Sequence, residues 1–123
     1  MNPKKYGRKD IVRRTFEFAV AIIQLTRKLP KDTASFVVGR QLIRSGTSVG
    51  ANTKEAQLSS TRKNFAHKLQ IALSEIDETI YWLELSRGTG LLLEDDVKCI
   101  LSEALEIKKI LIAIVKKTKS NNK

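Results

Sequence analysis

Cysteine, proline, glycine and aromatic residues are all scarce in this chain of 123 residues. It holds one cysteine, two prolines and six glycines, and aromatic residues make up 6% of it. Cys99 has no second thiol with which to form an intramolecular disulfide or a CxxC zinc site. We therefore interpret it as a small buried or half-buried side chain. The few prolines and glycines leave few places where a helix must stop.

Long hydrophobic runs are missing as well. No apolar stretch approaches the ~18 residues that a membrane span needs, and the first residues lack the hydrophobic segment of a signal peptide. We therefore expect no contact with a membrane and a cytoplasmic location. The length suits one domain, and 41% apolar residues are enough to bury one core.

Recognisable catalytic motifs are absent too, including the P-loop, GxGxxG, HExxH and the nucleophile elbow. The only histidine, His67, follows Asn64 at the spacing where a di-iron bundle has glutamate. Three carboxylates, Glu75, Asp77 and Glu78, are close in sequence, and we interpret them as solvated or salt-bridged groups. The sequence thus predicts no metal, no cofactor and no enzymatic activity.

Apolar residues recur at helical spacing in four segments. We expect helices over residues 10–28, 33–57, 62–86 and 93–117, with frayed basic termini. Short connections between such helices predict an all-α, antiparallel up-down-up-down four-helix bundle in a single domain. Asp10 is the expected N-cap of the first helix, Pro30 follows its end, and Gly88 is expected in a left-handed conformation after the third.

The first predicted helix carries two apolar rows, which is more than the core of a lone bundle requires. We expect one of the two rows to be covered by another protein chain. The first row is Phe16, Ala19, Val20 and Ile23, and the second is Phe18, Ile22, Leu25 and Leu29.

The second predicted helix contains Gly39, Gly46 and Gly50, each of which costs roughly 1 kcal/mol of helix stability relative to Ala. Close approach of a neighbouring helix is the simplest compensation, and a break between Ser45 and Gly50 is the alternative. Ser45 and Asn52 fall within the apolar seam of this helix and need hydrogen-bond partners. We favour structural hydrogen bonds, with a ligand contact as the alternative.

Charge is unevenly distributed along the chain, whose formal net charge is +10. Residues 1–74 hold 15 Lys/Arg against 4 Asp/Glu, whereas residues 75–123 hold 8 against 9. Helix-borne basic patches attract phosphate backbones, and general solubility is the alternative explanation of these charges. The residues predicted to bind nucleic acid are Lys4, Lys5, Arg8, Lys9, Arg13, Arg14, Arg40, Arg44, Lys54, Arg62, Lys63 and Lys68.

A spaced polar motif lies in the middle of the chain, with the form Q-x-x-R-x-x-x-S-x-x-x-N-x-x-E. It is followed by a second run from Phe65 to Glu78 and by Tyr81-Trp82-Leu83. This pattern resembles the bacterial four-helix bundle proteins encoded in 23S ribosomal RNA intervening sequences, and it is similar to the accessory variability protein of diversity-generating retroelements. The positions that match the motif are Gln41, Arg44, Ser48, Asn52, Glu55 and Glu78.

The resemblance implies a homopentamer without catalytic residues or a cofactor. It also implies RNA or DNA, and a reverse transcriptase, as partners. Together with the charge distribution, it predicts a non-catalytic homo-oligomeric scaffold that binds nucleic acid through a basic surface with little sequence specificity. The alternative is a protein-interaction or assembly module that does not bind nucleic acid directly.

Overall fold

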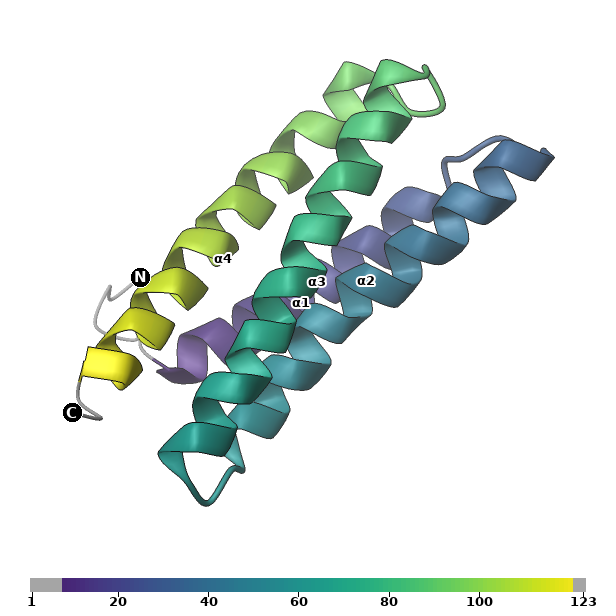
Figure 1. Cartoon of the computed structure of the whole chain (residues 1–123). Coiled ribbons are helices and arrows are strands. Elements are labelled where there is room, and N and C mark those ends of the chain that lie inside the picture. The colour runs from purple at the N-terminus through teal and green to yellow at the C-terminus, as the bar shows by residue number, and fades with distance from the viewer. Residues whose placement is uncertain (1–7, 121–123) are drawn as a thin grey trace.

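Four long helices account for almost all of the structure, a computed structural model that describes residues 8–120, with side chains from Ile11 onward. Neighbouring helices run in opposite directions, each packs against the next, and the first closes against the last (Figure 1). The predicted all-α up-down bundle is confirmed. The helices are α1 (Arg8–Thr26), α2 (Thr33–Gln57), α3 (Arg62–Gly88) and α4 (Glu94–Ser120).

Local side-chain hydrogen bonds begin two of these helices. Asp32 caps α2 by accepting a hydrogen bond of 2.8 Å from the backbone N–H of Ser35. Thr61 caps α3 in the same way, accepting from the N–H of Asn64 at 3.1 Å. In both cases a side-chain oxygen satisfies an N–H that has no partner within the helix. The prediction for Asp10 was wrong, because α1 already begins at Arg8 and Asp10 lies inside it.

The ends of the helices differ from prediction by a few residues. Helix α1 stops at Thr26, where hydrogen bonds between residues three apart tighten its last turn before Pro30. The left-handed residue after α3 is Gly90, with φ of 77°, whereas Gly88 remains helical. Helix α4 continues to Ser120, beyond the predicted residue 117. Most of the expected frayed termini lie outside the described residues.

Helix α2 is continuous through Gly46 and Gly50, so the alternative of a break there is excluded. A Cβ atom at Gly46 would lie 2.9 Å from two side-chain carbons of Ile22, and one at Gly50 would lie 3.1 Å from the backbone oxygen of Thr15. The glycines therefore let α1 and α2 pack closely, which is the compensation the sequence predicted.

The core uses only one of the two apolar rows of α1. Phe18, Ile22 and Leu25 are buried, whereas Phe16 is 67% exposed and Val20 and Ile23 are also exposed. The largest fully buried side chains from the other helices are Leu42, Val49, Leu69, Ile76, Leu83, Val97, Ile107 and Leu111.

Within the described residues, no helix is both long enough and apolar enough to cross a membrane.

Candidate nucleic-acid interface

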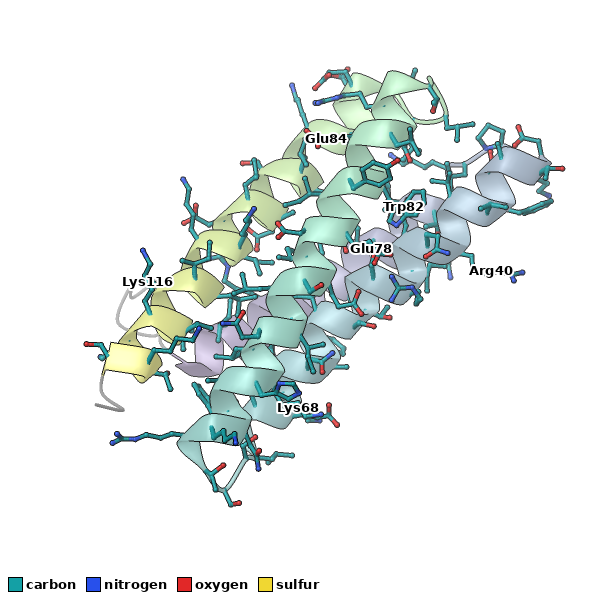
Figure 2. The ribbon with its side chains drawn as sticks, in the orientation of Figure 1. Arg40, Lys68, Glu78, Trp82, Glu84 and Lys116 are labelled. Atoms are coloured by element: carbon teal, nitrogen blue, oxygen red, sulfur yellow. The ribbon has the colours of Figure 1, made fainter. Side chains whose placement is uncertain are left out.

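The antiparallel arrangement concentrates positive charge at one end of the bundle. The start of α1, the end of α2, the start of α3 and the end of α4 meet there (Figure 1). We call this the basic half, defined as residues 11–16, 46–74 and 108–120. It contains eleven Lys/Arg and a single acidic residue, Glu55. The opposite half, residues 17–45 and 75–107, contains seven Lys/Arg and eleven Asp/Glu. Lys68 and Lys116 lie toward the basic end in Figure 2, whereas Arg40 lies toward the other end.

Among the described residues, several of the predicted nucleic-acid-binding residues form ion pairs with carboxylates. Arg13 pairs with Glu17 at 3.3 Å, and Lys68 pairs with Glu55 at 3.4 Å. Two guanidinium nitrogens of Arg14 bind the two carboxylate oxygens of Glu103, at 2.7 and 3.1 Å. Arg44 binds two glutamates of α3. These cations are partly neutralised by carboxylates and are weaker candidates for phosphate contact.

Three other predicted residues are exposed and have no carboxylate within 4.0 Å among the described residues. Lys54 and Lys63 belong to the basic half, but Arg40 lies in the opposite half, so the structure does not bring it together with them. Arg62 is exposed at the first turn of α3, next to Lys63. Lys4 and Lys5, and the side chains of Arg8 and Lys9, lie outside the described residues.

Sequence reasoning missed the lysines near the end of α4. Lys109, Lys116, Lys117 and Lys119 are exposed and belong to the basic half, although they were not among the predicted binding residues. The signal that could have found them is topological. In an up-down bundle the last turn of the fourth helix must lie at the same end as the start of the third. The C-terminal end of a helix also favours cations.

The motif residue Arg44 lies at the centre of a polar cluster that joins α2 to α3. Its Nη1 lies 3.2 Å from both carboxylate oxygens of Glu75, its Nη2 binds Glu78, and its Nε donates to Gln41 at 3.2 Å. The indole N–H of Trp82 also donates to Glu78, at 3.1 Å. This hydrogen bond from Trp82, followed by the one from Arg44, lowers the pKa of Glu78 below its usual 4.5.

The polar residues predicted in the seam of α2 make structural hydrogen bonds. Ser45 Oγ donates to the carbonyl of Gln41 at 2.9 Å and lies 2.8 Å from Thr79 Oγ1 on α3. Asn52 donates to the carbonyl of Ser48 at 2.9 Å, which is a bond within α2 itself. Ser45 therefore joins α2 to α3, whereas the motif residue Asn52 makes a bond within α2.

The acidic residues between Glu75 and Glu106 are largely engaged in contacts between helices. Asp77 on α3 pairs with Lys108 on α4 at 2.6 Å. Asp96 on α4 pairs with Lys28 at 3.0 Å, and a hydrogen bond from Lys28, with a second one from a backbone N–H, lowers the pKa of Asp96. The three carboxylates Glu75, Asp77 and Glu78 all have cationic partners, as the salt-bridge interpretation predicted.

Two reactive side chains are on the surface. Cys99 is exposed, so its predicted burial was wrong: it projects from the outer side of α4, between the buried Val97 and Ile100. His67 is exposed on α3 in the basic half. Among the described residues, no group of three or more His, Cys, Asp or Glu side chains could hold a metal ion.

Comparison with known proteins agrees with this geometry. The family model described as 23S rRNA-intervening sequence protein matches residues 8–113. The chain belongs to this family. A crystal structure from the S23 ribosomal protein family, from Bacteroides thetaiotaomicron VPI-5482, is 42% identical, with a TM-score of 0.81. The match covers 86% of this chain and 98% of that one, which is described as a protein of unknown function. Curated proteins gave no match.

The motif lies within the part of the chain that matches the 23S rRNA-intervening sequence protein family. The match spans the whole Gln41–Glu55 run and the α3 residues that bind it. In this member, the motif residue Arg44 joins α2 to α3. The basic half is a separate charged surface of the bundle.

Proposed function

We propose that this protein is a non-catalytic homo-oligomeric scaffold that binds nucleic acid through its basic half, with little sequence specificity. The observation that carries the proposal is the ratio of eleven Lys/Arg to one acidic residue in that half. Such a local excess raises the concentration of a polyanion near the surface and speeds its association. Cations that replace condensed counterions on the phosphate backbone then provide the binding free energy.

Little sequence specificity follows from the kind of side chains presented. Base edges are read mainly by bidentate Arg, Asn and Gln contacts in a groove, whereas lysine binds phosphate as a point charge. Among the described residues, the exposed lysines of the basic half that have no carboxylate within 4.0 Å include Lys54, Lys63, Lys109, Lys116 and Lys117. We therefore expect contacts that position the protein on the backbone without selecting a base sequence.

The absence of catalysis is part of the proposal. The ionisable cluster with the most contacts, around Arg44, is a set of ion pairs between α2 and α3. Glu78 in this cluster is held in the charged form, because the hydrogen bonds from Trp82 and Arg44 lower its pKa. A carboxylate of this kind is poorly suited to general acid chemistry near neutral pH, which requires a raised pKa.

An electrophoretic mobility shift tests the binding. The full-length protein is titrated into a labelled mixed-sequence nucleic acid at 50 and 200 mM salt. We expect a shift at 50 mM, and with six phosphate contacts an affinity about 1,000-fold weaker at 200 mM. No shift at 50 mM would exclude this function.

The second part of the proposed function is self-assembly. Self-assembly is also the basis of the alternative function, a protein-interaction module that does not bind nucleic acid. The outer row of α1, which is Phe16, Ala19, Val20 and Ile23, faces away from the core. Phe36, Val37 and Ile43 are exposed on the adjacent α2. Apolar side chains exposed on two neighbouring helices favour a protein neighbour, and we propose that the neighbour is a second copy of this chain.

The family resemblance suggests a pentamer for this assembly. Size-exclusion chromatography with light scattering measures it directly. A pentamer of 13.9 kDa chains has a mass of about 70 kDa, and a strict monomer at micromolar concentration would contradict assembly. A reverse transcriptase partner rests on the resemblance alone.

A further inference from the structure

We propose that the basic half binds across the backbone of double-stranded nucleic acid rather than along a single strand. The inference rests on the proposed function and names the form of nucleic acid that this surface fits. Three features of the described residues support it: the spread of the cations over four helices, the strength of their combined charge, and the isolation of the exposed rings.

The cations of the basic half come from every helix. Arg13 and Arg14, which also bind carboxylates and are therefore the weaker members, lie on α1. Lys54 lies on α2, the Arg62–Lys68 segment on α3, and four exposed lysines on α4. Helix axes in a bundle are ~8–10 Å apart, so cations that project outward from neighbouring helices are spread over at least about that distance. The major groove of a duplex is about 12 Å wide. Cations with this spacing can reach phosphates of both strands on either side of a groove.

The charge of this surface also favours the polyanion with the higher charge density. A duplex carries one negative charge per ~1.7 Å of its axis and condenses more counterions than a single strand. Each phosphate neutralised contributes about 0.9 to the salt slope on a duplex but only about 0.7 on a single strand. A surface that binds mainly by charge therefore gains more from a duplex, contact for contact.

Proteins that bind single strands usually add a row of aromatic side chains on which successive bases stack. Among the described residues, the exposed rings of the basic half are Phe16 on α1 and His67 on α3. These two helices are diagonal in the bundle, since α1 packs on α2 and α4. Two isolated rings on opposite helices do not form a continuous stacking track, so a single strand loses its main source of affinity here.

Fluorescence anisotropy with three labelled probes tests the inference on the full-length wild-type protein. The probes are a 24-base-pair DNA duplex, an RNA duplex of the same sequence, and an unstructured single strand of 24 nucleotides. At 100 mM salt we expect at least one duplex to bind ~10-fold or more tightly than the single strand, with a steeper salt slope. Both duplexes present phosphates, so comparing the two affinities shows whether the surface prefers DNA or RNA.

The outcomes separate this inference from the proposed function. A single strand that binds as tightly as both duplexes would overturn the inference while leaving nucleic-acid binding intact. Failure of all three probes to bind even at 50 mM salt would overturn both. Preference for either duplex, together with a dependence of log affinity on log salt that is steeper than for the single strand, is the result that supports it.

Discussion

At the scale of single residues, the glycines of α2 left two interpretations open, close helix packing or a break in the helix. The structure shows close packing. Gly46 lies against α1 with no room for a Cβ atom, and Gly50 lies against it with little room for one. Their cost to helix stability could be read from the sequence. Which neighbour they approach could not, because that depends on the register between two helices.

We expect Gly46→Ala to destabilise the protein by on the order of 1 kcal/mol. The new Cβ would lie 2.9 Å from carbons of the fully buried Ile22. Overpacking of this kind costs about 1–3 kcal/mol, which exceeds the roughly 1 kcal/mol gained in helix propensity. Urea denaturation measures the free energy of unfolding of the variant and the wild type.

Gly88→Ala is the matched control. Gly88 is helical, and nothing lies within 4 Å of a Cβ atom placed there. This substitution should be neutral or stabilise the protein by about 0.4–1 kcal/mol. If Gly46→Ala were as well tolerated as Gly88→Ala, the close packing of α1 on α2 would be wrong.

Trp82→Phe should raise the pKa of Glu78 toward its usual 4.5. The substitution removes the indole N–H, which is the largest cause of the lowered pKa. Because the pKa of Glu78 is lower in the folded state, its stabilising contribution is present above pH ~4.5 and is lost as pH falls through the lower folded value. The variant should therefore lose less stability on acidification than the wild type.

NMR titration of the Glu78 side-chain carboxyl gives the pKa in both proteins. Tyr81→Phe is a suitable control, because Tyr81 is an exposed neighbour whose ring contacts Trp82 without donating to Glu78. An unchanged Glu78 pKa in Trp82→Phe would show that the indole hydrogen bond is not its cause.

At the scale of helices, sequence periodicity predicted all four elements and placed their bounds to within three residues. The two rows of α1 were both visible as apolar patterns, but the sequence did not show that the row of Phe18 is buried and that of Phe16 exposed. The choice depends on the rotation of α1 about its axis. That rotation is fixed by contacts such as Ile22 with Gly46, between residues distant in sequence.

The exposed row of α1 leads to a prediction about assembly. We expect the double variant F16S/V20S to reduce the mass measured by light scattering from the oligomer toward 13.9 kDa. Its helicity by circular dichroism should stay close to that of wild type, because Phe16 and Val20 contribute little to the core. Loss of apolar area from a contact between copies weakens that contact.

The double variant L93S/L105S removes two exposed leucines of the α4 region and serves as the control. It should keep the mass of the wild-type oligomer. Two results would show that the outer row of α1 is not the contact. Either both variants dissociate equally, or F16S/V20S keeps the mass of the wild-type oligomer.

At the scale of the whole molecule, the charge distribution looks different in the structure from its appearance in the sequence. Along the chain the division lies between residues 1–74 and 75–123. In the bundle it lies between the two ends, because antiparallel packing brings the lysines of α4 beside the start of α3. The sequence therefore indicated Lys54 and Lys63 as candidates for nucleic-acid binding, but not Lys116 and Lys117. It also indicated Arg40 and Arg44, which lie in the opposite half.

The most direct test of the account compares two triple variants with the same loss of charge. K63Q/K116Q/K117Q removes three exposed lysines from the basic half, and R27Q/K31Q/R40Q removes three exposed cations from the opposite half. Binding to a labelled duplex is measured by anisotropy across a series of salt concentrations.

We expect the first variant to bind at least ~10-fold more weakly at 100 mM salt and to have a salt slope shallower by up to about 2.7, at ~0.9 per lost contact. The second should retain nearly the wild-type affinity and slope. Equal losses in the two variants would show that net charge, and not the basic half, determines binding, and would contradict the central claim.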